Sequence, residues 1–480
     1  MRILLITLFL AVLTTNAQAA TYTVTTTAAT GAGSFRQAIL DSNAPANGTH
    51  TIAFSAAFPV NGQISLGSNL PVLGANSLTI TGGTRTPRID GQSLYSILRL
   101  GNTTARLELS DLTLQNGFAD ESGGGCIHVS SANMQSAVLT ATRVSINNCK
   151  VSGTNLVRGG GIYWASTGGS VSLVDSQMIG NTATATANVG ESNGGAVFTT
   201  TNFSALRTLF ESNGTVSANG GGTGGALYLG GTGTFHAITE STFRFNGASP
   251  ASPNFGFGGA VHIACTNCST QIVRSYLRGN SANYGGAIYA RRPSGTTIDV
   301  YLTLANSTFY NSSVLEQGGA VLMNSGTSLS ASNNTFYNAD ATAGAHLAFI
   351  GTPEVSFFRA NLLAPTVFGT ACTGAFSLPT PGFVNANLFS DTSCSSLATG
   401  ALANTPLGSV TVDERPGEIG VLRFSGSAVI DSISMNSLCE PRDARFQLRP
   451  QDGDGDGVAR CDVGAYESPY DIIFLSGFEA

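Results

Sequence analysis

The 480-residue sequence contains little charge, since Asp, Glu, Lys and Arg together make up only 10% of it. The formal net charge of −6 has the wrong sign for a nucleic-acid-binding surface. Beyond the first 20 residues, no apolar run reaches the roughly 18–20 residues that a membrane helix needs. These absences argue against a nucleic-acid partner and against a transmembrane span in the mature chain.

The sequence is instead rich in small and turn-forming residues. It holds 59 Gly, with many Ser, Thr and Asn between them. This composition is typical of an all-β or repeat protein rather than a helical one.

The first 20 residues, MRILLITLFLAVLTTNAQAA, have one Arg, an apolar run and a small-x-small site at Ala17–Ala19. This pattern predicts a secretory signal peptide over residues 1–19. No Cys follows the predicted cleavage site, so we do not expect a lipid anchor. We expect the mature chain to be exported.

Eight cysteines in an exported chain favour disulfides over free buried thiols. The connectivity stays open, and pairing nearest neighbours predicts the bridges Cys126–Cys149, Cys265–Cys268, Cys372–Cys394 and Cys439–Cys461. A redox or metal-binding pair is the alternative for the CTNC stretch. Neither a helix nor a second ligand pair follows that stretch, which favours a turn disulfide.

Two short signatures recur along the middle of the chain. The first is a Gly-Gly motif, seen as GGCIH (from Gly124), GGGIY (Gly159), GGAVF (Gly194), GGALY (Gly224), GGAVH (Gly258), GGAIY (Gly285), GGAVL (Gly318) and a degraded AGAHL (Ala343). The second is an Asn two or three residues after an apolar residue, at Asn116, Asn148, Asn181, Asn213, Asn246, Asn280, Asn311 and Asn338. Successive Asn residues of this series are 27 to 34 residues apart. Recurrence at such an interval indicates stacked structural repeats.

The residues within each repeat alternate with a period of two, which indicates short strands separated by corners. Stacking such units gives an all-β parallel solenoid with neighbouring coils about 4.8 Å apart. We expect the Gly pair to form a tight corner with positive φ. Ile288 and Phe243 exemplify the core columns, and each Asn is expected to hydrogen-bond the Asn of the next coil.

A column of alternating charge precedes the apolar anchors by three residues. Its members are Asp111, Arg143, Asp175, Arg207, Glu240, Arg274, Asn306 and Asn333. We expect these side chains to point outward and to place each charge beside an opposite one on the next coil. This favours a structural, register-setting ladder over a catalytic role.

The two signatures resemble the paired GGA[ILV] and FxxN repeats of polymorphic outer-membrane proteins, which are right-handed parallel β-helices. Two end stretches resemble a family of secreted bacterial proteins with a choice-of-anchor type C-terminal domain, namely VTTTAATGAGSFRQAILDSNA and SAVIDSISMNSLCEPRDARFQLRPQDGDGDGVARCDVGAYE. Together these matches touch most of residues 22–467. The resemblance implies a right-handed parallel β-helix that is secreted or displayed on the outer surface of a bacterium, and it implies little about activity.

The stretch SFRQAILDSN places Phe35, Ala38 and Ile39 at helical spacing. We predict a short amphipathic helix that caps the first coil, in preference to a membrane-active helix at this length. The sequence predicts a signal peptide at 1–19, a cap and first coils at 20–100, a repeat region at 101–345, C-terminal coils with a disulfide-linked closing region at 346–470, and a tail at 471–480. The tail, DIIFLSGFEA, is either a sorting signal or a simple strand cap.

Enzymes built on β-helices need a carboxylate cluster, or a cationic base beside a metal-binding acid, on neighbouring coils. The sequence shows no such cluster on a shared column, so no catalytic residue is predicted. His128 and His262 share a column with Tyr163, Phe198, Tyr228 and Tyr289, which favours stacked aromatic positions over catalytic histidines.

The stretch DGDGDG places Asp452, Asp454 and Asp456 at alternate positions, as in the first half of a calcium loop. The twelfth position, where an acid is expected, holds Val463. Calcium and a solvated acidic turn are therefore both open, and we predict no other cofactor.

Insertions concentrate between each Asn and the next Gly-Gly, in residues 149–158, 182–193, 214–223 and 247–257. We predict that these loops form one ridge, with Asn254 and Phe255 as candidate binding residues, or else merely tolerate changes in length. The predicted function is an adhesin-like binding protein that recognises glycans or another protein surface. A polysaccharide-active β-helix lyase or hydrolase and a structural envelope component are the alternatives.

Overall fold

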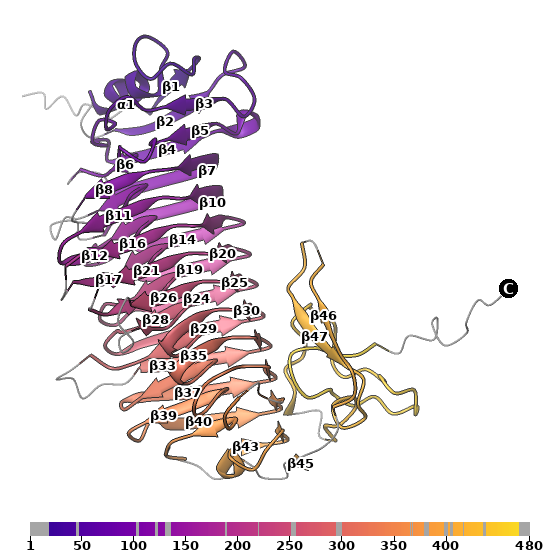
Figure 1. The fold of residues 1–480 in the computed structure, drawn as a ribbon. Helices are drawn as coiled ribbons and strands as arrows, with labels where there is room; N and C mark the ends of the chain where they lie inside the picture. The colour runs from indigo at the N-terminus through magenta and orange to yellow at the C-terminus, as the bar shows by residue number, and fades with distance from the viewer. Residues whose placement is uncertain are drawn as a thin grey trace, which may run out of the picture.

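The computed structural model describes residues 19–469, with gaps at 45–47, 102–104, 121–122, 130–135, 188–189, 219, 251–255, 294–299, 365, 367, 379–383, 398–401, 404–406, 416, 435–437. The predicted signal peptide, apart from its last residue, the candidate binding residues Asn254 and Phe255, and the predicted tail 471–480 lie outside the described residues. The chain forms a tall stack of parallel coils with a separate C-terminal module beside its lower half (Figure 1).

The largest sheet supplies two faces of the solenoid, which β7 and β10 join by bending from one to the other. The first face holds β1 (Ala20–Val24), β2 (Thr49–Phe54), β4 (Ser77–Thr81), β7 (Arg106–Gln115), β10 (Val138–Asn147), β14 (Ser170–Val174), β19 (Asn202–Leu206), β24 (Phe235–Thr239), β29 (Cys268–Val273), β33 (Val300–Ala305), β37 (Thr327–Ser332), β40 (Glu354–Arg359) and β43 (Val384–Asn385). The second face holds β3 (Gln63–Ser65), β5 (Arg88–Asp90), β15 (Gln177–Ile179), β20 (Leu209–Glu211), β25 (Thr242–Arg244), β30 (Tyr276–Arg278), β34 (Thr308–Tyr310), β38 (Thr335–Tyr337), β41 (Leu362–Leu363), β44 (Leu388–Phe389) and β45 (Leu402–Ala403).

Two further parallel sheets close the coils. The third sheet holds β8 (Phe118–Asp120), β11 (Lys150–Gly153), β12 (Leu156–Arg158), β16 (Thr182–Ala185), β17 (Glu191–Asn193), β21 (Gly214–Ser217), β22 (Gly222–Thr223), β26 (Gly247–Pro250), β27 (Gly256–Phe257), β31 (Ser281–Tyr284) and β35 (Ser313–Gln317). The fourth sheet holds β6 (Leu98–Arg99), β9 (Ile127–Val129), β13 (Ile162–Trp164), β18 (Val197–Thr199), β23 (Leu227–Leu229), β28 (Val261–Ile263), β32 (Ile288–Ala290), β36 (Val321–Asn324), β39 (Leu347–Ile350) and β42 (Cys372–Thr373). Two 3-10 turns, η1 (Gly83–Arg85) and η2 (Ser395–Leu397), interrupt the coils.

The predicted solenoid is confirmed, and its core is built from columns of equivalent residues. Ile288 and Phe243 are fully buried, as expected. The rings of Phe210 and Phe243 on neighbouring coils stack with centroids 4.5 Å apart. Apolar ladders of this kind remove the core side chains of each coil from water by covering them with the next coil.

The Gly-Gly corner has two separate physical causes. The first Gly adopts a left-handed conformation, as at Gly258 with φ of +67°, which suits a residue without a Cβ. The second Gly faces the neighbouring coil, because a Cβ on Gly225 would lie 2.1 Å from the carbonyl oxygen of Gly259. The degraded repeat AGAHL was predicted to begin one residue too early, at Ala343. Val321 pairs with Leu347, so the glycine equivalent to Gly318 is Gly344, which has positive φ.

The predicted Asn column is wrong in one respect, because it merges two adjacent columns. Asn116, Asn148, Asn311 and Asn338 have positive φ and form the corner itself. The register places Asn148 beside Gly180, so Asn181 belongs one position later, in a buried column. That buried column is the predicted amide ladder, with Asn181, Asn213, Asn246 and Asn280 linked by hydrogen bonds of 2.9–3.0 Å.

The predicted helix is confirmed as α1 (Phe35–Asn43), which begins at the capping hydroxyl of Ser34. It buries Phe35, Ala38 and Ile39 over the first coils, where the Phe35 ring stacks on Phe54 with centroids 5.8 Å apart.

The four predicted disulfides are also all present, as Cys126–Cys149, Cys265–Cys268, Cys372–Cys394 and Cys439–Cys461.

The insertions lie on one side of the stack, as predicted, but their described parts are mainly strands rather than loops. They form the third sheet, whose two rows of strands enclose a small core of Val151, Val157, Ala183 and Ala185. A continuous ladder between coils satisfies the backbone of these long segments, which is why they do not remain irregular loops.

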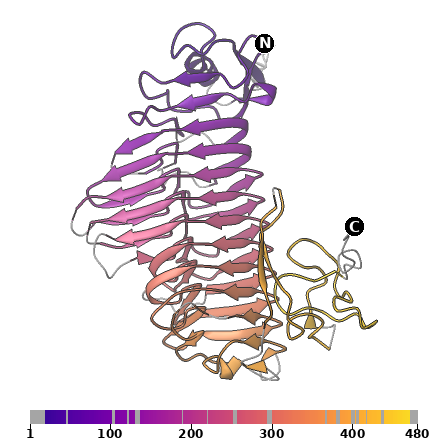
Figure 2. The same cartoon turned by 45° about the vertical axis from the view of Figure 1, so that its right-hand side comes forward.

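The C-terminal module consists of residues 407–469 and follows the last coils. It contains the antiparallel hairpin of β46 (Val410–Asp413) and β47 (Val421–Phe424), and its remaining described chain is mainly irregular. Leu422, Phe424 and Val463 pack with Leu362 and Leu388 of the last coils in one apolar cluster. Figures 1 and 2 both show the module lying along the solenoid with the hairpin directed back toward earlier coils.

Candidate ligand-binding cleft

A cleft of about 1120 Å³ lies between the second face of the solenoid and the C-terminal module. Its solenoid wall comes from β15, β20, β25 and the corners that precede them. Its module wall comes from the segment between β46 and β47, from residues 444–447 and from Tyr466. The two walls therefore belong to parts of the chain that are more than 150 residues apart.

The solenoid wall carries the predicted charge ladder, whose alternation is confirmed. All eight members have φ between 47° and 57°, so the ladder runs along a left-handed corner that turns its side chains outward. Arg207 Nε lies 2.6 Å from Asp175 Oδ1, and Arg274 Nη2 lies 3.2 Å from Glu240 Oε1. Hydrogen bonding from Arg207 lowers the pKa of Asp175, so this acid stays ionised at neutral pH.

The lower end of the same ladder is covered by the module. The Nδ2 of Asn306 donates to the carbonyl oxygen of Arg442 over 2.8 Å. The backbone N–H of Glu440 donates to Asn333 Oδ1 over 3.0 Å. The ladder thus changes from charged to neutral residues at the point where the module docks. Asp175, Arg207 and Glu240 of its charged part line the cleft.

On the module wall, three arginines converge on Asp413. Arg445 Nη1 lies 2.7 Å from Asp413 Oδ2, Arg415 lies at 3.1 Å, and Arg423 also contacts this oxygen. Hydrogen bonding from Arg445 lowers the pKa of Asp413 to about 2. The guanidinium groups are thereby held in fixed positions at the cleft.

One contact ties the tip of the hairpin to the solenoid. Glu414 Oε1 accepts hydrogen bonds from the Tyr276 hydroxyl and from Arg278 Nη1, both over 2.6 Å. Gly420 lies against the Tyr276 ring, where an added Cβ would approach within 2.6 Å. This clasp sets the width of the cleft.

The charges that line the cleft are compensated. Four carboxylates and five guanidinium groups line it, and each is within ion-pair distance of an opposite charge. A guanidinium beside a carboxylate favours its ionised form, as at Asp175, where Arg207 lowers the pKa. A general acid for glycosidic cleavage instead requires a carboxyl that is still protonated near neutral pH. The arrangement is therefore suited to hydrogen bonding and poorly suited to proton transfer.

Behind the cleft, the module buries a cluster of charged residues. Arg449 Nε lies 3.5 Å from Glu467 Oε2, and neither side chain is exposed. The guanidinium also donates to the backbone carbonyls of Asp462 and Gly464 over 2.9 and 2.8 Å. Burial raises the pKa of Glu467 to about 7 and that of Asp462 to about 6, and it raises the pKa of Asp443 as well.

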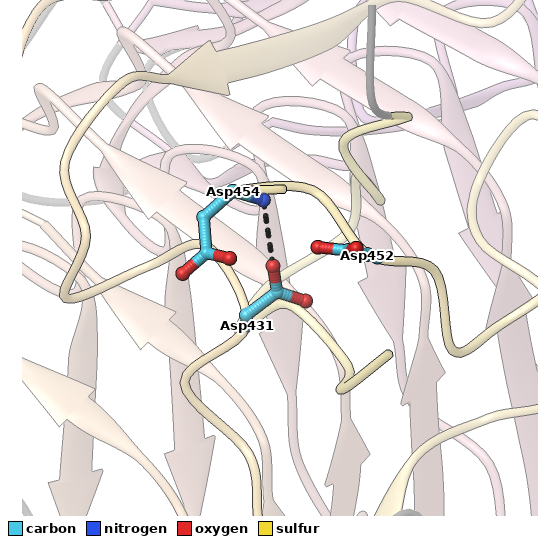
Figure 3. A group of neighbouring side chains, drawn as sticks. All are labelled: Asp431, Asp452 and Asp454. Carbon is cyan, nitrogen blue, oxygen red and sulfur yellow. Dashed lines mark hydrogen bonds between the residues drawn. The ribbon is translucent and has the colours of Figure 1, made fainter. Parts of the chain in front are cut away.

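The acids of DGDGDG only partly converge. Asp452 and Asp454 lie with Asp431, whose carboxylate is buried, and one oxygen of each lies within 4.8 Å of the others (Figure 3). Asp456 turns away and pairs with Arg460 over 3.0 Å. Asp431 also accepts backbone N–H groups of Gly453 and Asp454, both over 2.8 Å, so the turn is already partly satisfied by its own backbone.

The aromatic column has the stacked form that the sequence favours. In this column the ring centroids of His128 and Tyr163 lie 5.3 Å apart, and those of His262 and Tyr228 lie 5.2 Å apart. Burial lowers the pKa of both histidines. Neither lies at the cleft, and His262 is fully buried.

The sequence did not predict the module wall of the cleft. It also did not predict that Asp431 lies beside Asp452 and Asp454. Asp413, Glu414, Arg445 and Asp431 carry no repeat signature that could single them out. On the solenoid, the sequence does carry a signal for a second polar column beside the charge ladder. A Ser, Thr or Asn follows each ladder residue from Asp175 onward. These residues are buried, as at Ser241, whose hydroxyl accepts the backbone N–H of Thr208.

Comparison of the chain with protein families, with curated proteins and with solved structures finds no match. The resemblance to polymorphic outer-membrane repeats and to a choice-of-anchor domain therefore stays a prediction. In the part of the chain that the structure describes, no helix has the length and apolar content needed to cross a bilayer.

Proposed function

We propose that this chain is an exported, adhesin-like binding protein that holds its ligand in the cleft between the solenoid and the C-terminal module. The observation that carries the proposal is the cleft itself, which combines two rigid walls, about 1120 Å³ of volume and a lining of fixed hydrogen-bonding groups. Sites of this kind, at the junction of two structural units, are where ligands are usually bound. The four disulfides support an extracellular location.

Rigidity on both walls supports binding rather than passive packing. The solenoid wall is anchored by parallel strands on every coil, and the module wall is held by the Asp413 arginines and the Glu414 clasp. Preformed groups lose little side-chain entropy when a ligand arrives. The paired carboxylates of the cleft argue against the alternative of a hydrolase or lyase, because each acid is held by an arginine.

The test is to fill the cleft and measure binding of the full mature chain to a glycan array and to intact bacterial and host cells. Thr242→Trp places an indole from β25 into the cleft lining. Thr113→Trp is the matched control, because Thr113 occupies the same outward column on β7, two coils above Gln177, which lines the cleft.

We expect Thr242→Trp to weaken binding at least about tenfold, the loss that about 1.4 kcal/mol brings, and Thr113→Trp to bind like the parent chain. Equal binding by both folded variants would contradict the cleft as the binding site. Turnover of an acidic or neutral polysaccharide that Thr242→Trp abolishes would instead support the enzyme alternative.

The calcium prediction continues as a proposal about the module, now with Asp431 alongside Asp452 and Asp454. Three carboxylates within reach of one position offer the oxygen ligands that calcium prefers. If calcium binds, chelation lowers the thermal stability of the parent module, and the Asp431→Asn/Asp452→Asn/Asp454→Asn variant no longer responds to chelator. A parent chain that is indifferent to chelator has only an acidic turn here.

A further inference from the structure

The charge balance of the cleft restricts the chemistry of its ligand. Arg207 is paired with Asp175, Arg244 with Glu211, and Glu240 with Arg274. An anionic ligand must compete with these carboxylates for the same guanidinium groups. It would also be repelled by the acids that remain beside it, since like charges placed together across an interface cost several kcal/mol.

The pairs nevertheless leave donors and acceptors facing the cleft. Arg207 uses Nε and Nη2 for Asp175, and its side chain stays 49% exposed. The carboxylate of Asp175 stays 37% exposed. A hydroxyl group both donates and accepts, so it can bridge the free N–H of the arginine and the free lone pair of the aspartate. A ligand dense in hydroxyl groups satisfies such a surface without carrying charge.

Two aromatic rings supply a complementary apolar contact. Phe446 lines the cleft and is 44% exposed, and the guanidinium of Arg274 covers one of its faces at 4.3 Å. Tyr466 lies deeper in the same wall, beneath Arg423 at 5.1 Å. The ring of a sugar has one face of C–H groups that packs against an aromatic side chain, while its hydroxyls point sideways to polar partners.

The solenoid wall also repeats along its axis. Asp175, Arg207 and Glu240 stand at one corner on three consecutive coils, which are about 4.8 Å apart. This spacing is close to the length of one hexose unit in an extended chain. The cleft volume of about 1120 Å³ exceeds the ~300–1,000 Å³ of ordinary small-molecule pockets, which suits several linked units rather than a single sugar.

From these observations we infer that the cleft binds a neutral, extended polysaccharide laid along the solenoid axis, with hydroxyl groups on the ladder pairs and a sugar face on Phe446. This inference rests on the proposed binding function and assigns its ligand class. A protein partner fits less well, because charged residues are depleted at the centre of protein interfaces and here they form the floor of the cleft.

The experiment is isothermal titration of the full mature chain with neutral hexasaccharides of β-1,4-linked glucose, mannose, xylose and N-acetylglucosamine. A hexamer of galacturonic acid serves as the length-matched acidic probe. We expect at least one neutral probe to bind about tenfold or more tightly than the acidic probe. We also expect its Kd to change less than about twofold between low and high salt, because no net charge is exchanged.

Two matched double variants locate the binding. Asp175→Asn/Arg207→Gln removes a ladder pair within the cleft, and Asp111→Asn/Arg143→Gln removes the equivalent pair above it. The first is expected to weaken binding of the neutral probe about tenfold or more and the second less than about twofold. Phe446→Ala is expected to weaken binding without a change in salt dependence. Melting followed by Trp164 fluorescence checks that each variant is folded.

Three results would overturn the inference: tighter binding of the galacturonate hexamer in the cleft, binding of none of the neutral probes by the parent chain, or equal weakening by both double variants. The first two leave the proposed function standing if Thr242→Trp still abolishes surface binding. They refute the ligand class together with the function if Thr242→Trp has no effect on surface binding.

Discussion

The solenoid and the C-terminal module bury polar groups in different ways. The solenoid buries neutral amides, with Asn181, Asn213, Asn246 and Asn280 each hydrogen-bonded to the next. The module buries charge, with Arg449 and Glu467 both fully enclosed. A neutral ladder can be repeated at every coil at little cost, whereas a buried ion pair is stable only when all of its partners are present.

This contrast explains how one chain supports both a long scaffold and a specific site. Repetition gives the solenoid many equivalent contacts, so no single one decides its stability. The module has one copy of each contact and depends on long-range pairing with the coils, such as Tyr276 with Glu414. The cleft arises where the repeated surface meets the unrepeated one.

The largest difference between the two regions should follow from removing the buried arginine. Arg449→Met leaves Glu467 and Asp443 without their cation, and we expect it to destabilise the module by about 3–5 kcal/mol. Arg143→Met, on the exposed ladder, is expected to cost less than about 1 kcal/mol. Hydrogen-exchange mass spectrometry of module peptides measures the first effect, and Trp164 fluorescence reports the solenoid. Equal effects of the two variants would remove the distinction between the regions.

The two regions should also respond to pH in opposite directions. Glu467 and Asp462 have higher pKa values in the folded protein, about 7 and 6, than in the unfolded chain, so folding takes up protons. The module therefore loses stability as the pH rises from about 4 to 7, on the order of 3 kcal/mol for Glu467. Asp413, whose pKa is lowered to about 2, titrates below this window.

In the solenoid, burial lowers the pKa of His236 and His346 to about 4, so folding releases protons. The solenoid therefore loses stability as the pH falls from about 6.5 to 4. Unfolding by denaturant at several pH values, with Trp164 for the solenoid and exchange of module peptides for the module, checks both signs. Parallel trends in the two regions would contradict this assignment.

Asparagine substitutions sharpen the comparison within the solenoid. Asn213→Gly removes an oxygen that accepts from the backbone and amide of Asn181, and we expect a loss of roughly 2–3 kcal/mol. Asn148→Gly makes the same change at an exposed left-handed corner, where glycine is favoured, and should be nearly neutral. Thermal unfolding followed at Trp164 separates them, and similar losses would mean that both positions belong to one column.

The features that could be predicted from the sequence are those that repeat along the chain or involve residues close together in it. The corner glycines, the core columns, the charge ladder and the disulfide pairs recur or pair locally, so they were predictable. The sequence did not predict that Asn148 and Asn181 occupy two adjacent columns, because Asn is accepted both at the exposed corner and at the buried position that follows it. The cleft could not be predicted from the sequence. Glu414 hydrogen-bonds to Tyr276 and Arg278, which lie 138 and 136 positions earlier in the chain, and no repeat marks that pairing. Asp431 likewise joins Asp452 only through the fold.

The smallest predicted effect concerns the ladder. Arg207→Asp places an acid between Asp175 and Glu240, and the resulting repulsion should destabilise the solenoid by about 1 kcal/mol at low salt. High salt should reduce this loss, because exposed charges are screened. Trp164 melting at two salt concentrations measures it. A variant that melts like the parent at low salt would show that the ladder pairs contribute nothing to stability.

The most direct test of where function lies is hydrogen–deuterium exchange of the full chain with and without the neutral hexasaccharides. The cleft predicts slower exchange in β15, β20 and β25 and in residues 414–420 and 444–447, with no change in the third sheet. Protection of residues 149–158, 182–193 and 214–223 instead, on the side of the insertions, would contradict the cleft and restore the ridge as the binding surface.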